Sequence, residues 1–472
     1  MICGDIKYNH NGYTKNQKGV KEMIKQNLLE CNQLERSEDE VTARAGLIMF
    51  DGFMKAMKIE DIINRHMPVP GSNRGLKAWQ YIRPLTLMQY GGGRHIADLR
   101  ELREDTTLQK AAGLKTIPSD SGAGDWLLRM GNGNGIEGMD KVHREADIKM
   151  LKMDKNKEYT LWADPTIIEL GDKDYAEMIY TGQEGDRPIL VGLKELPIFV
   201  HHKYRKGNAM GGTKEAVQSG FEVVEAAGKK IKHTAFDSEF YNAEVINFLK
   251  GKNNLTFTIV ADKDAAVKEV IKQIAEGQWK PYHNIHGIKT NKEIAVTVHA
   301  MNGTDAFTLV VLRWKKEQLS LLEPDGYFYH AIATNLEVDA EAVIKIHDES
   351  IPDACRAVWQ YNERAQMENY LKELKIGVGM EQMPCGEFEA NAMYFSIGVL
   401  TYNLVISQKH FVIQEGMQNC TVATLRWKLV HVAAWIAYHS NRVRLKIATT
   451  LEKFNHYLRM LKRMEAIAAL PY

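Results

Sequence analysis

Cysteine is scarce in this sequence, and its spacing argues against two classes of protein. Only five cysteines occur among 472 residues, at positions 3, 31, 355, 385 and 420, and no two of them have C-x-x-C spacing. An odd number of widely separated cysteines argues against a disulfide framework, and the absence of C-x-x-C pairs argues against a zinc ribbon. We therefore expect reduced thiols and a cytoplasmic protein.

The sequence also lacks a long hydrophobic run. Its most apolar stretch, Met393 to Ile406, is 14 residues long, and Ser396, Thr401 and Asn403 interrupt it. A membrane-spanning helix needs about 20 apolar residues, so this stretch predicts a helix buried in the core and no membrane partner. The opening segment, MICGDIKYNHNGYTKNQKG, has no apolar part, so we expect no secretion signal.

An overall excess of charge is missing, since 61 basic and 60 acidic residues give a net charge of +1. Taken alone, this total argues against nucleic-acid binding, because most nucleic-acid-binding domains are basic. The charge is uneven, however: residues 421–472 contain nine lysines and arginines and two acidic residues, a net charge of +7, and the other 420 residues sum to −6. Local basic surface binds a phosphate backbone, so the C-terminal region is a candidate for DNA contact. His201 and His202, beside Lys203 and Arg205, predict a second basic surface.

Length and periodicity predict several regions in the chain. At about 150 residues per domain, the length suggests three domains. Residues 1–45 are polar and predict a loosely ordered arm. Residues 46–155 have helical periodicity and predict an N-terminal helical domain that binds DNA ends, in which two short helices joined by LKTIPSDS form either a plain hairpin or a helix-turn-helix. Residues 377–472 predict a mainly helical region for DNA contact or dimerisation, with a β-hairpin in VAAWIAYHSNRVRLKIA.

The middle of the chain, residues 156–376, predicts an α/β fold. Three consecutive strand-like segments are followed by alternating helix and strand patterns up to about residue 260, which indicates a mixed sheet. Residues 278–335 are again rich in β-branched and aromatic residues. Because this stretch is too long for a loop, we predict an inserted β-rich subdomain at about 262–338.

Two aspartates stand where an α/β sheet collects ligands. Asp164 lies inside an apolar strand pattern, where a carboxylate is costly to bury without a partner. Asp237 directly follows another strand, at the end where ligands bind in such sheets, although it could equally cap the next helix. With a third carboxylate, Glu368, they would form a minimal oxygen-only set for two Mg²⁺ or Mn²⁺ ions, the arrangement that supports phosphodiester cleavage.

A long helix predicted over about 354–376 carries that glutamate. At 100° per residue, a stripe about 80° wide contains one carboxylate, three cations and a tyrosine. Such a stripe could bind a phosphate-bearing polymer. It could equally be a solvated helix face with ion pairs between residues four positions apart. Its members are Tyr361, Arg364, Glu368, Lys372 and Lys375.

The same residues resemble a known signature. The spacing Tyr361-x-x-Arg364-x-x-x-Glu368-x6-Lys375 is similar to the Y-R-E-K signature of DDE transposases of bacterial insertion sequences, the insertion-sequence-four superfamily. The helix YNERAQMENYLKELK, the element DSEFY after Asp237 and the segment GNA at 207–209 resemble its thirteen-eighty group. The later patterns ANAMYFS, VLTYNL and TLRWKL at 390–429 extend the similarity.

The resemblance implies an RNase H-like core with a β-rich insertion between Asp237 and Glu368, which 131 positions separate. It implies that Asp164, Asp237 and Glu368 are catalytic and bind two Mg²⁺ or Mn²⁺ ions, and that Tyr361, Arg364 and Lys375 contact phosphates of the transposon end. Lys372, on the same helical stripe, is a further candidate for DNA contact. It also implies a homodimer on double-stranded DNA that binds terminal inverted repeats and performs cut-and-paste transposition. The location would be the cytoplasm of a bacterium, at the nucleoid.

One departure leaves alternatives open. The family commonly has D-A-T at the first aspartate, whereas this chain has Asp164-Pro165-Thr166. A proline removes a hydrogen-bond donor from a strand and is usually confined to edges or bulges. The alternatives are a catalytically inactive DNA-binding relative that keeps the fold, and an RNase H-like nuclease without strand transfer.

Overall fold

The computed structural model describes residues 39–471, except for 317–325, 347–348, 414–415 and 440–441. It also describes two short strands that pair with each other, β1 (Glu22–Met23) and β2 (Gln33–Leu34). Most of the predicted polar arm, together with Cys3 and Cys31, lies outside the described residues.

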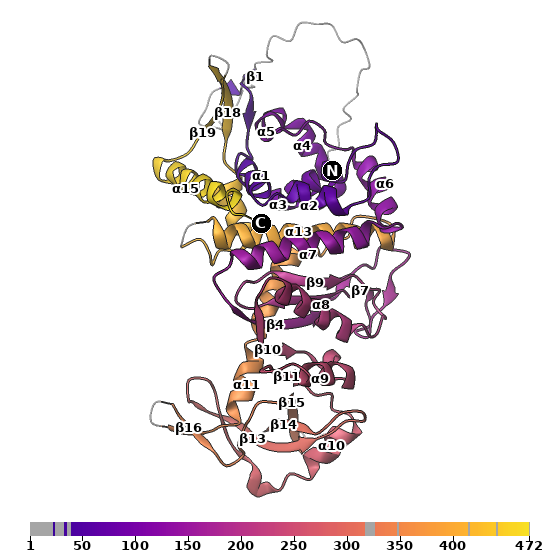
Figure 1. Cartoon of the computed structure of the whole chain (residues 1–472), viewed down its shortest axis with the longest axis vertical. Helices are drawn as coiled ribbons and strands as arrows, with labels where there is room; N and C mark the ends of the chain where they lie inside the picture. Colours follow the sequence, from indigo (N-terminus) through magenta and orange to yellow (C-terminus); the bar gives the residue numbers. More distant parts are fainter. Residues whose placement is uncertain are drawn as a thin grey trace.

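A nine-stranded mixed sheet forms the centre and one end of the molecule (Figure 1). In one half, β4 pairs in parallel with β10, and β10 with β11, while β8 and β9 add antiparallel strands on the other side of β4. This order confirms a large mixed α/β sheet and is consistent with an RNase H-like core. These strands are β4 (Glu158–Pro165), β8 (Ile189–Leu193), β9 (Phe199–Lys203), β10 (Lys230–Phe236) and β11 (Thr256–Val260).

Four further strands, formed between Asp237 and Glu368 in the chain, extend the same sheet. β15 pairs antiparallel with β11, and β14, β13 and β12 follow outward. They share a continuous hydrogen-bond ladder with the core and do not form a sheet of their own. Their bounds are β12 (Lys280–His283), β13 (Lys289–His299), β14 (Phe307–Lys315) and β15 (Tyr327–Thr334); next to them lie α10 (Ala265–Lys272), η3 (Glu276–Gln278) and the hairpin β16 (Val343–Ile346) and β17 (Glu349–Pro352).

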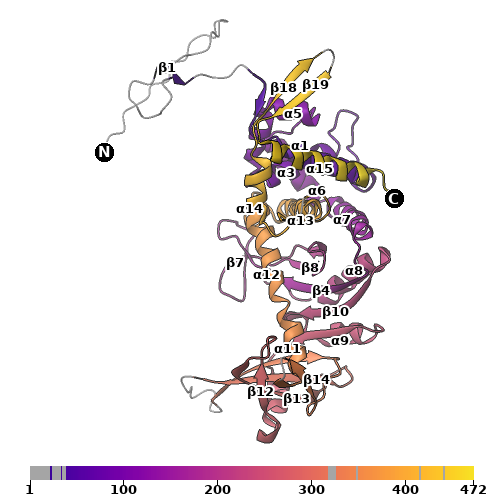
Figure 2. The same ribbon diagram turned by 90° about the vertical axis from the view of Figure 1, so that its left-hand side faces the viewer.

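Helices cover both faces of the core sheet. Gly220 of α8 lies against Val191 of β8, whereas Gly192, the next residue of that strand, lies against Met367 of α12. Because successive strand residues point to opposite faces, α8 and α12 lie on opposite sides of the sheet, as Figure 2 shows. The bounds are α8 (Thr213–Ala226), α9 (Ala243–Lys250), α11 (Cys355–Asn362), α12 (Ala365–Lys372) and the π-helical turn η4 (Glu373–Val378).

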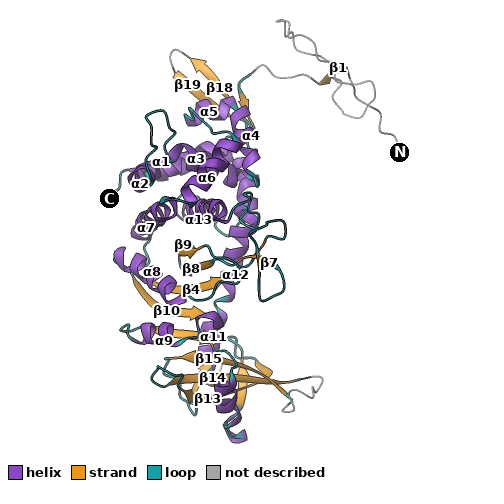
Figure 3. Cartoon of the chain, turned by 90° about the vertical axis from the view of Figure 1, so that its right-hand side faces the viewer, coloured by secondary structure: helices purple, strands orange, loops and turns teal. Residues whose placement is uncertain are grey.

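The helix α13 (Phe388–Phe411) is buried on every side, which confirms the core helix predicted from its apolar run. Eighteen of its 24 residues are buried. The N-terminal helices α3 and α6 pack on one side of it and the sheet lies on the other, while α7 lies beside it and also contacts β9 (Figures 1 and 3). In the described part of the chain, no helix is long and apolar enough to cross a membrane.

The N-terminal region consists of helices that range from the short α4, α5 and α2 to the 19-residue α7. Gly131 ends α6 so near to α13 that a side chain there would collide with the Glu389 carbonyl. The bounds are α1 (Gly46–Ala56), α2 (Ile59–His66), α3 (Trp79–Gly91), η1 (Ile96–Asp98), α4 (Leu99–Glu104), α5 (Thr106–Ala112), α6 (Asp120–Gly131) and α7 (Gly135–Met153).

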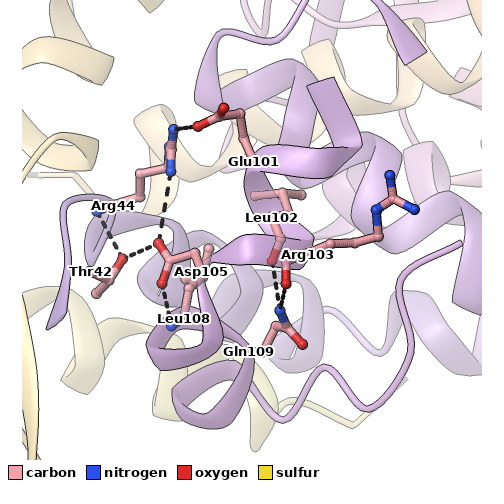
Figure 4. Close-up of polar contacts among 8 residues, drawn as sticks. All are labelled: Thr42, Arg44, Glu101, Leu102, Arg103, Asp105, Leu108 and Gln109. Carbon is pink, nitrogen blue, oxygen red and sulfur yellow. Dashed lines mark hydrogen bonds and ion pairs between the residues drawn. The ribbon is translucent and has the colours of Figure 1, made fainter. Parts of the chain in front are cut away.

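The two ends of the described chain meet in a three-stranded sheet. The predicted hairpin is confirmed as β18 (Ala434–His439) and β19 (Arg442–Ile447), and β18 pairs with β3 (Val41–Thr42). Figure 4 shows how this sheet attaches to the N-terminal helices: Thr42 donates to Asp105 at 2.6 Å, and Arg44 donates to Glu101 at 2.6 Å. The predicted last helix is α15 (Leu451–Ala468), which packs on α1; α14 (Val422–Leu425) and η5 (Arg426–Val430) precede the hairpin.

One buried amide joins the two layers. The Asn403 side chain of α13 accepts from the Phe199 backbone N–H at 2.9 Å and donates to the Phe199 carbonyl at 2.8 Å. It also donates to Asp147 of α7 at 2.9 Å, and it is fully buried. Asn403 thus connects the sheet, α7 and α13 at one point.

We expect Asn403→Ala to lower the free energy of unfolding by about 3 kcal/mol, because it leaves two backbone groups and a carboxyl buried without this partner. Denaturant titration of the purified protein measures the loss. The matched control is Asn455→Ala on the exposed side of α15, which should change stability by less than about 0.5 kcal/mol. Equal stability of the two variants would contradict this role for Asn403.

Candidate functional site

The two predicted aspartates meet at the ends of neighbouring strands. Asp164 is the penultimate residue of β4, and Asp237 directly follows β10, whose last residue, Phe236, pairs with Ala163. Because these strands are parallel, both carboxylates emerge at the same edge of the sheet. The strand β4 ends at Pro165, which still pairs with Ile189 of β8, so the proline does not disturb the pairing of Asp164 with Leu190.

A single guanidinium lies between the two carboxylates. One terminal nitrogen of Arg364 is 3.0 Å from Asp164 Oδ2 and 3.4 Å from Asp237 Oδ2. The Asp164 and Arg364 side chains are each 11% exposed, and Asp237 is 41% exposed. The structure therefore places Arg364 at the centre of the carboxylate pair, and not on the open surface expected of a residue in a solvated stripe.

The predicted continuous helix over about 354–376 is wrong in one respect. It is divided into α11, α12 and η4, with Glu363 and Arg364 in a turn between the first two. Around this break, the N–H groups of Arg364 and Met367 donate to carbonyls three residues back, at 3.0 and 2.8 Å, in place of the α-helical four. The tightened turn changes the angular spacing, so Arg364 is buried while Glu368 and Lys372 are exposed.

Burial and crowding of like charge perturb the titration of this site. Burial raises the pKa of Asp164 to about 7; Arg364 opposes the shift, while Asp237 and Glu368 add to it. Burial likewise raises the pKa of Tyr361 to about 12, with Arg364 again opposing and the carboxylates adding. Glu368 is thus near enough to act on both groups through its charge. Perturbed carboxyl groups at a strand edge are typical of functional sites.

The donor set suits a hard divalent cation. In the described part of the chain, no three histidine, cysteine, aspartate or glutamate side chains gather closely enough to enclose a metal ion. Two of the predicted donors, Asp164 and Asp237, nevertheless converge on one positively charged nitrogen, which acts as a stand-in for a cation. Carboxylate oxygens are the ligands that Mg²⁺ and Mn²⁺ prefer, so Asp164 and Asp237 fit such an ion.

The other stripe residues lie along the same column of helices. The Tyr361 ring lies 6.0 Å from the Arg364 guanidinium carbon and 5.7 Å from the His330 ring. Lys375 donates to the Ile167 carbonyl at 2.7 Å, so its ammonium group is held beside the end of β4. Lys372 is exposed.

The second predicted basic surface is wrong for two of its members. His202 is buried, accepts or donates a hydrogen bond at 3.0 Å to Ser396, and lies 4.5 Å from the His143 ring. Burial lowers the pKa of His202 well below its usual value, so the ring is neutral. Arg205 is also buried, and of the four residues only Lys203 is exposed. Adjacent residues of a strand point to opposite faces, so His202 and Lys203 of β9 cannot lie on one basic surface.

Two arginines that the sequence analysis did not identify, the buried Arg426 and the partly exposed Arg94, bind backbone carbonyls near the site. Arg426 donates to the carbonyls of Tyr90 at 2.6 Å and Gly377 at 2.7 Å, and Arg94 donates to the carbonyl of Ile376. These cations stabilise the carboxyl ends of α3 and η4, where helix dipoles favour positive charge. A lone arginine in the TLRWKL pattern was the only sequence signal for this contact.

Comparison with known proteins identifies a family. The sequence profile of the family described as "Transposase DDE domain group 1" matches residues 33–469. A search of curated proteins finds no match. One solved structure, the cryo-EM structure of a piggyBac transposase synaptic complex with hairpin DNA, has 12% sequence identity and a TM-score of 0.45, over 84% of this chain and 83% of that one.

Removal of the shared guanidinium should destabilise the protein in a pH-dependent way. Because Asp164 has a raised pKa of about 7, its carboxyl is ionised at pH 8 and mostly protonated at pH 5. In metal-free buffer we expect Arg364→Gln to cost about 3 kcal/mol at pH 8, where it leaves a buried carboxylate without its cation, and clearly less at pH 5. Denaturant titrations at both pH values measure this, with the exposed Lys372→Gln as control. The same loss at both pH values would contradict the ion pairing.

Proposed function

Because the chain belongs to group 1 of the DDE transposase domains, we propose that it binds the terminal inverted repeats of a mobile DNA element, cleaves phosphodiester bonds there and transfers the resulting 3′ ends to target DNA. The observation that carries the proposal is the meeting of Asp164 and Asp237 around one cationic group at the sheet edge. Two carboxylates that share a positive charge can also share a divalent ion.

We assign the catalytic and metal-binding roles to Asp164, Asp237 and Glu368, and the metals to Mg²⁺ or Mn²⁺. When bound, two such ions would lower the pKa of the attacking water and stabilise the leaving oxygen. The burial of Asp164, which raises its pKa in the protein alone, supports a site built for a compensating cation. Glu368 extends from α12 on the solvent side, where it can complete the set.

DNA contact belongs to the cations and the tyrosine of the same helical column. We assign Tyr361, Arg364, Lys372 and Lys375 to phosphates of the transposon end. Arg364 presents a planar fork that matches phosphate oxygens as well as carboxylates. Lys375 lies beside the end of β4, which carries Asp164, and Lys372 is exposed to solvent on α12.

The finer assignment follows the sequence resemblance. We propose a bacterial insertion-sequence transposase with the Y-R-E-K signature, similar to the thirteen-eighty group, which acts as a homodimer on paired DNA ends at the nucleoid. The N-terminal helices and the basic hairpin β18–β19 are attached to each other through β3. We assign end recognition to these helices and DNA contact to the basic C-terminal region.

The alternatives are an inactive DNA-binding relative and a nuclease that does not join strands. Pro165 is the feature that favours the first, but it is the last residue of its strand and leaves the pairing of Asp164 with Leu190 intact. A strand-transfer assay separates the second from a transposase.

The test uses a duplex of the DNA that flanks the reading frame, with its inverted repeats, and purified protein with Mg²⁺. We expect nicking at the repeat end, and a loss of about 10³-fold, equivalent to about 4 kcal/mol, for Asp164→Asn, Asp237→Asn or Glu368→Gln. Gel shift should show repeat-end binding retained in all three.

The exposed Asp305→Asn serves as control and should nick like the wild type. Full activity of Glu368→Gln or Asp164→Asn would remove the assigned role from that residue. Repeat-end binding without any nicking by the wild type would favour the inactive relative, and nicking without joining would favour the nuclease.

A further inference from the structure

The turn that carries Asp237 is fixed from the residues that follow it. Asp237 caps the short 3₁₀ helix η2 (Ser238–Phe240) and accepts from the Ser238 N–H at 2.5 Å. Phe240 is fully buried, with its ring 5.0 Å from that of Phe236. Asp237 itself is 41% exposed, so its position depends on how firmly this turn is held.

Glu239, between these residues, is clamped by two buried arginines. Arg205 donates to Glu239 Oε1 at 2.9 Å, and Arg187 pairs with the other carboxylate oxygen. The side chains of Arg187, Arg205 and Glu239 are only 9%, 5% and 12% exposed. Both oxygens of Glu239 therefore face fixed cations, which restrains its rotation as well as its distance.

The two arginines are themselves tied to the edge of the core sheet. The Arg187 N–H donates to the Arg205 carbonyl at 2.8 Å, and the Arg205 side chain donates to the Arg187 carbonyl at 3.1 Å. Arg205 also donates to the Gly211 carbonyl at 2.9 Å. Arg187 stands two residues before Ile189, and β8 pairs with β4 at Asp164 and Pro165. The clamp thus links the turn of Asp237 to the strands beside Asp164.

Burying two cations and one anion to hold a turn costs desolvation free energy. Desolvation of three ions offsets much of their attraction, and apolar residues of similar volume often stabilise a fold as well. Pairing of each carboxylate oxygen with its own cation fixes the orientation of the Glu239 side chain, which apolar packing would not do. Such a clamp suits a position where an adjacent carboxylate must be oriented.

We infer that Glu239 is a positioning residue that, through Arg187 and Arg205, holds Asp237 opposite Asp164 for a divalent cation. The inference rests on the proposed function, since it deepens the role given to Asp237. Glu239 contacts neither DNA nor metal in this assignment and acts through the turn alone.

The experiment compares Glu239→Gln with the wild type in full-length protein. Electron paramagnetic resonance of free Mn²⁺ measures binding of the metal alone, and we expect about a tenfold higher Kd for the variant. Nicking of the repeat end should fall about 10- to 100-fold at low Mg²⁺ and recover in part as Mg²⁺ is raised. The Kd for repeat-end DNA should stay within about threefold of the wild type.

The matched control is Glu195→Gln, because Glu195 is a half-buried carboxylate at the opposite end of β4, where it accepts from the Thr160 N–H at 2.7 Å. It should leave Mn²⁺ binding unchanged. If Glu239→Gln does not fold, Glu239→Asp replaces it, because it keeps the charge on a shorter side chain. This variant should show a smaller rise in the Kd for Mn²⁺ and a smaller loss of nicking at low Mg²⁺.

Unchanged Mn²⁺ binding and unchanged Mg²⁺ dependence in the folded variant would overturn the inference alone. A wild type that binds Mn²⁺ but never nicks would overturn the proposed function, while the Mn²⁺ comparison would still decide the role of Glu239. A wild type that binds no Mn²⁺ would overturn both.

Discussion

A helix that is apolar on every side has to be covered on every side, and α13 imposes this constraint on the whole molecule. Leaving its side chains in water would cost roughly 1.5–3 kcal/mol for each large apolar residue. The N-terminal helices cover one side, and the core sheet covers the other. The polar side chains that interrupt the apolar run each form a buried hydrogen bond to a neighbouring element. Asn403 accepts from the Phe199 N–H of the sheet, Ser396 shares a hydrogen bond with His202, and Thr401 donates to Gln89.

The candidate site lies where that arrangement brings strand ends and a helix together. The parallel pair β4 and β10 determines which two carboxylates share an edge, and the column of α11, α12 and η4 supplies the opposite charge. Arg364 balances the pair, the Arg187–Glu239–Arg205 clamp restrains the turn beyond it, and Arg426 fixes the far end of the column. Of these arginines, only Arg364 contacts the carboxylate pair directly, and the others hold the segments around it.

Much of this could be predicted from the sequence, where the signal is local. Strand patterns placed Asp164 within one strand and Asp237 directly after another, and the apolar run predicted α13. The structure adds that the two strands are parallel neighbours, so both carboxylates lie at one edge of the sheet. The break at Arg364 could not be predicted, because every residue there is compatible with a helix and the turn is tightened where the arginine meets two distant aspartates. The Glu239 clamp was missed for the same reason: its partners lie 34 and 52 positions away along the chain.

The central position of α13 also has a consequence for the order of synthesis. The helices that need it as a core are complete by Met153, whereas α13 begins only at Phe388. At about 5 to 20 residues per second, the ribosome takes on the order of 10 to 50 s to make the intervening chain. During that interval the apolar sides of α3, α6 and α7 lack the helix that buries them in the folded protein. The strand β3 can pair with β18 only later still, when that strand has been synthesised. The nascent chain is thus open to chaperone capture or aggregation until its last hundred residues emerge.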